Sequence, residues 1–168
     1  MIYFDNAATS YPKPREVINE INKAFTIYGA NPGRSGHDMS MNTALAVYSA
    51  RETLNTFFDG YGCEYVSFTA NCTQSLNMAI KGILKKGDHV IISSLEHNSV
   101  LRPVVKMVEQ GLISYSVFVV SQNEEETLFN LKQEIKSNTK LIITTAVSNV
   151  FGDILPLGRI GEIAKANN

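Results

Sequence analysis

The feature that most constrains this chain is the alternation, from about residue 65 onward, of short apolar runs with longer amphipathic segments. Apolar runs rich in β-branched residues predict strands buried on both faces. We expect strands at residues 65–69, 89–93, 114–120 and 140–146. Apolar residues at helical spacing predict helices at 73–86, 125–136 and 159–166, and one that opens at Arg102-Pro103. This order is typical of a three-layer α/β/α fold with a mainly parallel sheet.

Two further helices are expected before the alternating region. Pro14 suits the first position of a helix whose apolar stripe extends to Tyr28, and Gly29 ends it. The second helix covers roughly residues 39–58 and closes at Asp59-Gly60.

Composition argues against several classes of protein. The 168 residues carry a formal net charge of −1 without a Lys/Arg cluster, so we expect no nucleic-acid partner. The apolar runs are far shorter than the ~20 residues of a membrane span. The N-terminus, which begins MIYFD, has no basic region followed by an apolar stretch, so we expect a soluble protein without a secretory signal. Cys63 and Cys72 have no CxxC or histidine-rich companions, which predicts a reducing, cytoplasmic location without disulfide or metal site.

The loop Thr69–Gln74, between a predicted strand and a predicted helix, carries the clearest signal for a ligand. Backbone N–H groups, the Thr73 hydroxyl and the positive end of the helix dipole together make an anion site. Asn71 and Gln74 also have the spacing of a capping box that merely starts a helix. The loop alone leaves both interpretations open, and neither the P-loop nor the dinucleotide motif occurs in the chain.

Polar side chains also follow two other predicted strands. His97 could stack on an aromatic ring or transfer protons, or its cluster could cap a helix through Asn98 or Ser99. Asn149 could bind a ligand or satisfy a turn. In parallel sheets, ligands bind beyond the carboxyl ends of the strands, so these loops together favour one site.

Two loops near the N-terminus, residues 5–9 and 31–37, are built mainly from Gly, Pro, Asn and other small residues. Small residues allow a backbone to approach a ligand closely. Arg34, in the second loop, could bind a carboxylate through two parallel hydrogen bonds, although most surface arginines have no such role.

Taken together, these segments resemble the class V family of pyridoxal-phosphate enzymes, most closely the cysteine desulfurase and selenocysteine lyase branch. The similarity extends over essentially the whole chain in the family's order and spacing. The segments that carry it are YFDNAATS at residues 3–10, NPGRSGH at 31–37, FTANCTQSLN at 68–77, GDHVIIS at 87–93, Glu96-His97 and SNVFG at 148–152.

The resemblance implies the N-terminal part of the large domain of a fold type I pyridoxal-phosphate transferase. It assigns residues 1–38 to the active-site region and residues 39–168 to a partial cofactor-binding domain. It places the Schiff-base lysine, the aspartate that pairs with the pyridine nitrogen and the nucleophilic cysteine downstream, so this chain alone should be inactive. It also implies a homodimer and a possible sulfur-acceptor protein as partner.

The cofactor implied by the resemblance is pyridoxal 5′-phosphate. The backbone N–H groups of Cys72 and Thr73, with the Thr73 hydroxyl, would hold its phosphate. His97 would stack on the pyridine ring and assist proton transfer, and Asn149 would bond the phenolic oxygen. Asn71 stands where many relatives have glycine, which asparagine's tolerance of left-handed backbone angles would permit. Asn98 replaces a second histidine that is common in the desulfurases.

The implied substrate is a small amino acid, held near the backbone of Ala7 and Ala8 and near Arg34. The implied reaction converts L-cysteine to L-alanine and leaves a persulfide on the enzyme, or does the same for selenocysteine. Two alternatives stay open: an aminotransferase or other class V enzyme, and a non-catalytic module for a phosphorylated ligand if the chain is naturally this short.

Overall fold

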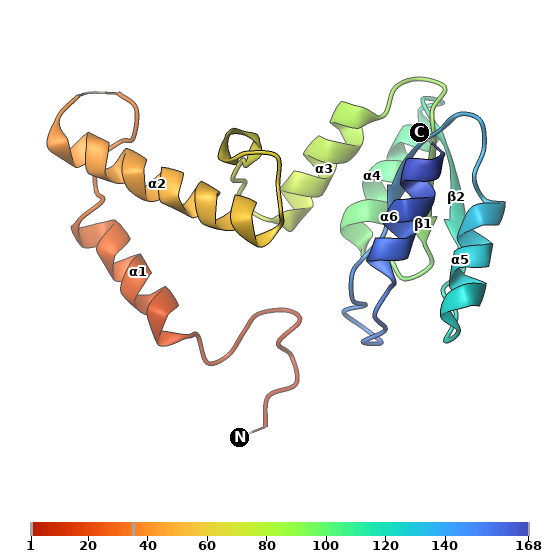
Figure 1. The fold of residues 1–168 in the computed structure, drawn as a ribbon, viewed down its shortest axis with the longest axis horizontal. Coiled ribbons are helices and arrows are strands. Elements are labelled where there is room, and N and C mark those ends of the chain that lie inside the picture. The colour runs from red at the N-terminus through yellow and green to blue at the C-terminus, as the bar shows by residue number, and fades with distance from the viewer. Residues whose placement is uncertain (1, 35, 168) are drawn as a thin grey trace. The chain divides into compact units, whose positions relative to one another are not determined.

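The computed structural model describes residues 2–34 and 36–167, which divide into two compact units, Met1–Phe68 and Thr69–Asn168 (Figure 1). The division expected after residue 38 separates segments by their place in an active site, not by compactness, and stays a prediction. No helix in the described ranges is long and apolar enough to cross a membrane.

The first unit contains two α-helices and one short 3₁₀ helix. Helix α1 (Arg15–Thr26) begins directly after Pro14, and α2 (Asp38–Phe57) is capped by His37, whose Nδ1 accepts the Ser40 N–H at 3.2 Å. The 3₁₀ helix η1 covers Cys63–Tyr65. Both long helices were predicted to within a residue or two, because each has a clear start and stop signal in the sequence.

The second unit is built on a three-stranded parallel sheet. Strands β1 (His89–Ser93), β2 (Ser114–Phe118) and β3 (Thr139–Ile143) lie in the order β2-β1-β3. The strands alternate with four helices: α3 (Cys72–Ile83), α4 (Asn98–Glu109), α5 (Glu124–Gln133) and α6 (Leu157–Ala166). The predicted α/β class with a mainly parallel sheet is confirmed.

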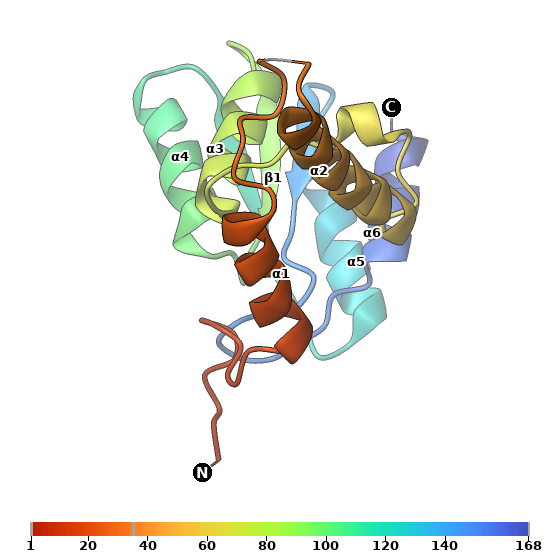
Figure 2. The ribbon, with the colours of Figure 1, turned by 90° about the vertical axis from the view of Figure 1, so that its left-hand side faces the viewer.

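The central strand separates two apolar cores. Val90 and Ile92 pack with α3 and α4 on one face of the sheet, whereas Ile91 packs with α5 and α6 on the other. Figure 2 shows this arrangement, with β1 between the two pairs of helices. Side chains alternate along a strand, so a strand that is apolar at every position can cover both faces. The three-layer prediction rests on this pattern and is confirmed.

The strand expected at residues 65–69 is not formed. Instead η1 ends at Tyr65, and Val66 is extended with φ −90° and ψ 118°. An extended backbone becomes a strand only when a neighbour completes its hydrogen-bond ladder, and within the described residues this segment has no partner strand. The prediction was wrong because the preference of these residues for an extended backbone does not indicate whether a partner strand lies beside them.

Helix α4 begins earlier than expected. The sequence predicts a helix that opens at Arg102-Pro103, but the helix starts at Asn98 and encloses Pro103, which is buried. Proline removes one backbone hydrogen bond inside a helix. Here His97 caps the helix six residues before Pro103, and the buried residues Val100 and Val104 pack the helix against the core on either side of Pro103.

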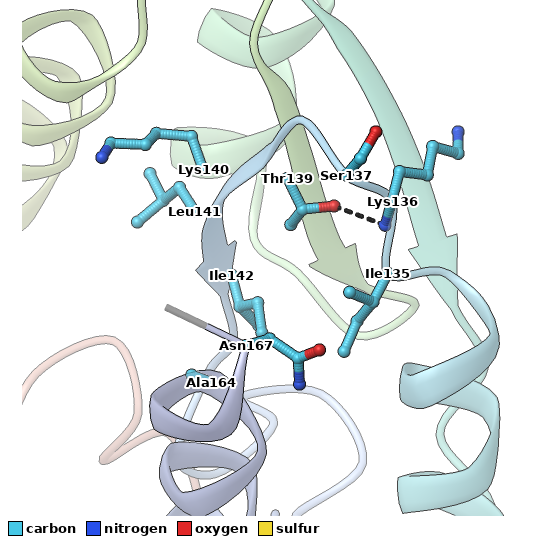
Figure 3. Close-up of a pocket in the computed structure, with 9 residues that line it drawn as sticks. All are labelled: Ile135, Lys136, Ser137, Thr139, Lys140, Leu141, Ile142, Ala164 and Asn167. Carbon is cyan, nitrogen blue, oxygen red and sulfur yellow. Dashed lines mark hydrogen bonds between the residues drawn. The ribbon is translucent and has the colours of Figure 1, made fainter.

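Strand β3 pairs only with β1 among the described strands, so its other side faces a cavity of about 740 Å³. Figure 3 shows the lining of this cavity. Its walls come from β3, the turn before it and the end of α6: Ile135, Lys136, Ser137, Thr139, Lys140, Leu141, Ile142, Ala164 and Asn167. The Thr139 hydroxyl accepts the Lys136 N–H at 2.8 Å and closes that turn. The cavity borders the open side of the sheet and includes none of the predicted site residues.

Candidate functional site

Two predicted cofactor residues line one cavity at the carboxyl ends of β1 and β3. The cavity has a volume of about 220 Å³ and is formed by residues 94–98 and 148–151. It includes His97 and Asn149, which are far apart in the sequence. They meet because β1 and β3 are parallel neighbours, so that the loops leaving their carboxyl ends share one edge of the sheet.

The ring of His97 is fixed by the start of helix α4. Its Nδ1 accepts the Ser99 N–H at 3.1 Å and lies 2.8 Å from the Ser99 hydroxyl oxygen. Because a backbone N–H can only donate, Nδ1 is an acceptor, and this network assigns the proton of the neutral ring to Nε2. A capping role for the cluster was expected through Asn98 or Ser99. The helix is capped, but by His97 itself.

Asn149 lies on a loop that its neighbours hold firmly. The buried hydroxyl of Ser148 accepts the Phe151 N–H at 3.2 Å, and the Ser148 N–H donates to the Asp153 carbonyl at 2.9 Å. Gly152 has φ +79°, a left-handed conformation that glycine adopts without strain. The Asn149 side chain is exposed, and no hydrogen bond engages its amide in the part of the chain that the structure describes. A rigid loop therefore presents a free polar group.

The loop after β1 is bonded to both neighbouring strand ends, which sequence reasoning missed. Oε1 of Glu96 accepts the Thr145 N–H at 2.7 Å, beyond the end of β3. The Ser94 hydroxyl accepts the Val120 N–H at 3.0 Å, beyond the end of β2. The only sequence signal for these contacts is the position of the polar residues directly after an apolar strand.

The N-terminus of helix α3 satisfies both interpretations of its loop. Asn71 Oδ1 accepts the Gln74 N–H and Gln74 Oε1 accepts the Ala70 N–H, both at 2.9 Å, so the capping contacts are formed. Asn71 is extended, with φ −169°, and does not use the left-handed angles expected to make asparagine acceptable here. Capping occupies neither the N–H groups of Cys72 and Thr73 nor the Thr73 hydroxyl, for which the described residues provide no acceptor.

These three free donors suit a phosphate. Backbone N–H groups at the start of a helix point outward along the dipole, and a hydroxyl adds one more donor to phosphate oxygens. Cys72 and Thr73 are both exposed, so an anion can reach them. They do not line the cavity of His97 and Asn149. Within residues 2–34 and 36–167, no group of three or more His, Cys, Asp or Glu side chains could hold a metal ion.

The predicted substrate residues belong to the first unit. Ala7 and Ala8 lie in a turn in which the Ala8 N–H donates to the Asp5 carbonyl at 3.1 Å. The Tyr3 hydroxyl lies 3.1 Å from the Asp5 carbonyl oxygen and fixes the start of this turn. Arg34 is exposed, and no ion pair engages it in the described ranges. Their place in one site with His97 stays a prediction.

The second unit is a parallel α/β/α unit with polar loops at adjacent strand ends and, among the described residues, unengaged donors at a helix N-terminus. The family model of class-V aminotransferases matches residues 2–168, and the chain belongs to this family. Members of this family are pyridoxal-phosphate enzymes.

Known proteins agree with this assignment. A probable cysteine desulfurase of Borreliella burgdorferi is 32% identical over 100% of this chain and 41% of its own length. The solved apo structure of cysteine desulfurase from Thermococcus onnurineus NA1 matches with a TM-score of 0.85 at 28% identity, covering 99% of this chain and 42% of that one. A structure of SspA in complex with cysteine matches with a TM-score of 0.83 at 27% identity, covering 99% and 48%. The chain thus spans less than half the length of these relatives.

Proposed function

We propose that this chain is the N-terminal part of a pyridoxal-phosphate-dependent cysteine desulfurase, which converts L-cysteine to L-alanine and retains the sulfur as a protein-bound persulfide. The observation that carries the proposal is the cavity at the ends of β1 and β3, in which His97 and Asn149 meet. The family match and the cysteine desulfurases among the relatives support this choice of reaction.

Residues of the second unit would hold the cofactor. The N–H groups of Cys72 and Thr73 and the Thr73 hydroxyl would bind its phosphate. His97 would lie against the pyridine ring, with its Nε2–H available to pass a proton, while Ser99 keeps the imidazole in place. The amide N–H of Asn149 would donate to the phenolic oxygen. When bound, pyridoxal phosphate supplies an electron sink that allows the Cα proton of an amino acid to leave.

Residues of the first unit would bind the substrate. The guanidinium of Arg34 matches the two oxygens of an amino-acid carboxylate, which it can bind through two parallel hydrogen bonds. The backbone of Ala7 and Ala8 has no bulky side chain and would lie beside the small cysteine side chain.

The groups that form the covalent bond to the cofactor and accept the sulfur are proposed to lie outside residues 1–168. None of the lysines in this chain has the sequence context of the family's Schiff-base lysine, and Cys63 and Cys72 do not match its nucleophile. The 168-residue chain alone is therefore proposed to be inactive. The parent protein is proposed to be a cytoplasmic homodimer that passes sulfur to an acceptor protein.

The test is an assay of the parent polypeptide that contains this chain. With L-cysteine and a thiol reductant, it should release alanine and sulfide in equal amounts. Borohydride reduction followed by peptide mapping should place the cofactor on a lysine outside residues 1–168. Transfer of the amino group to a keto acid without sulfide release would refute the desulfurase reaction. A label on a lysine within residues 1–168 would refute the proposal that the Schiff-base lysine lies outside these residues.

A further inference from the structure

We infer that Glu96 is a positioning residue, which fixes the separation between the loop that carries His97 and the loop that carries Asn149. The inference rests on the proposed function for what the two loops hold, but the contact itself can be tested without any cofactor. Glu96 is half-buried at the edge of the cavity that both loops line.

A single carboxylate oxygen makes the connection. Oε1 of Glu96 accepts the hydroxyl of Ser93, the last residue of β1, at 2.5 Å, and the N–H of Thr145 at 2.7 Å. Hydrogen bonds to an ionised carboxylate are shorter and stronger than those between neutral groups. The same oxygen is therefore tied to its own strand and to the chain that continues from the neighbouring strand.

The bond between Glu96 and the Thr145 N–H lies just beyond the last paired residues of β1 and β3. The backbone pairing of β1 with β3 ends at Ile92 and Ile143. Thr145 lies beyond that end, where the two chains would otherwise be free to separate. The Glu96 carboxylate thus continues the connection between the strands into the region where the loops diverge.

Hydrogen bonds also hold the two loops in the residues that follow Glu96 and Thr145. His97 directly follows Glu96, and Ser99 fixes its ring. The loop after Thr145 is closed by an antiparallel bridge between Val147 and Ile154. Two rigid loops joined at one carboxylate keep a constant spacing, so a change at Glu96 would move His97 and Asn149 apart as units.

Two substitutions of Glu96 distinguish the role of the accepting oxygen from that of the rest of the side chain. Glu96→Ala removes the acceptor, whereas Glu96→Gln keeps a carbonyl oxygen at the same place. Glu109→Ala is the matched control, because Glu109 is an exposed residue of α4 that, among the described residues, forms an ion pair only with Lys106. The first readout is amide hydrogen exchange of Thr145 in the 168-residue chain.

We expect the Thr145 amide to be protected in the unchanged chain. In Glu96→Ala its exchange should accelerate about ten- to a hundredfold, the range for losing a hydrogen bond to a charged group. Glu96→Gln, which keeps a neutral acceptor, should accelerate exchange clearly less than Glu96→Ala, and Glu109→Ala should not differ from the unchanged chain. Rescue by glutamine distinguishes a role of the acceptor from a general loss of stability.

The second readout is the visible absorption of bound pyridoxal phosphate in the parent protein. Glu96→Ala should weaken cofactor binding about tenfold or more and shift the absorption band, because His97 and Asn149 would no longer face the ring together. Glu96→Gln should restore both properties.

An unprotected Thr145 amide in the unchanged chain overturns the inference, and this outcome does not depend on any variant folding. Equal Thr145 exchange in Glu96→Ala and the unchanged chain also overturns it, as does cofactor binding that is identical in the two proteins. If the unchanged parent protein binds no pyridoxal phosphate, the proposed function fails, whereas the exchange of Thr145 still decides whether Glu96 joins the loops.

Discussion

Nδ1 of His89 lies 2.8 Å from the hydroxyl oxygen of Thr139, so a fully buried imidazole on the central strand is bonded to β3. Its other nitrogen, Nε2, lies 3.0 Å from the Ser116 hydroxyl on β2. One side chain thus connects the three strands, away from the ends that lead into the loops of His97 and Asn149. Lys136 donates to the same Ser116 hydroxyl at 3.2 Å, which adds a positive charge near the ring.

This arrangement predicts that stability falls in mild acid. The pKa of His89 is lowered, first because burial disfavours the charged ring and second because Lys136 is close, although Glu134 acts in the opposite direction. As the pH falls below about 6.5, the unfolded chain binds this proton before the folded chain does. The free energy of unfolding should therefore decrease from about pH 6.5 downward, and His89 should add no further loss below its folded pKa.

Urea unfolding of the 168-residue chain between pH 8 and pH 5 measures this effect. His89→Gln is the matched variant, since an amide retains hydrogen-bonding groups without titrating in this range. The slope of stability against pH should be smaller in His89→Gln than in the unchanged chain. Equal slopes in the two proteins would show that His89 does not titrate differently on folding.

The sequence predicted the parts of the fold that depend on local pattern. The strand at residues 89–93 was found because it is apolar at every position, and α2 because its apolar spacing continues for several turns. The start of α4 was missed because Pro103 is a strong local signal, whereas the true cap, His97, belongs to a residue type that caps helices less often than Asn or Ser.

The parts of the site that were missed depend on contacts between distant residues. Glu96 and Thr145 are 49 positions apart, and only the pairing of β1 with β3 brings them together. No periodicity within one segment can reveal such a bond. His97 and Asn149 were predicted to share a sheet edge because a general rule of parallel sheets connects strand ends, and the cavity that both residues line agrees with that rule.

The free hydroxyl of Thr73 predicts a selective effect on phosphate binding. Thr73→Val keeps the shape of the side chain and the backbone N–H but removes one donor. The affinity for pyridoxal 5′-phosphate should fall about ten- to a hundredfold, the range for a hydrogen bond to a charged group, while binding of pyridoxal without phosphate should not change. Calorimetric titration of the parent protein with both compounds makes the comparison.

Thr53→Val is the control for this experiment. Thr53 lies on α2, and its hydroxyl already donates to the Ser49 carbonyl within the same helix, so this hydroxyl is not a free donor. It should bind both compounds like the unchanged protein. If Thr73→Val binds pyridoxal phosphate with unchanged affinity, the hydroxyl does not contact the phosphate.

The cap of helix α3 predicts a loss of stability separate from ligand binding. Asn71→Ala removes the oxygen that accepts the Gln74 N–H, which should lower the free energy of unfolding by about 1 kcal/mol. Asn71→Ser retains a capping oxygen and should stay within about 0.5 kcal/mol of the unchanged chain. Urea unfolding monitored by circular dichroism tests both. Equal stability of the alanine and serine variants would contradict a capping role.

His97 caps α4 and is proposed to stack on the cofactor ring, and different substitutions can separate these two roles. As the cap of α4 it needs only an acceptor for the Ser99 N–H, which asparagine also supplies. As a partner of the cofactor ring it needs an aromatic face, which phenylalanine supplies without an acceptor. His97→Asn should therefore keep the stability of the unchanged protein but bind pyridoxal phosphate about two- to tenfold more weakly, the range for losing an aromatic contact. His97→Phe should keep most of the affinity but lose about 1 kcal/mol of stability.

The two variants are measured side by side in the parent protein, by urea unfolding and by cofactor titration. If His97→Asn binds pyridoxal phosphate as tightly as the unchanged protein, the proposed stacking role fails. If His97→Phe is as stable as the unchanged protein, the bond from the Ser99 N–H to His97 does not contribute to stability.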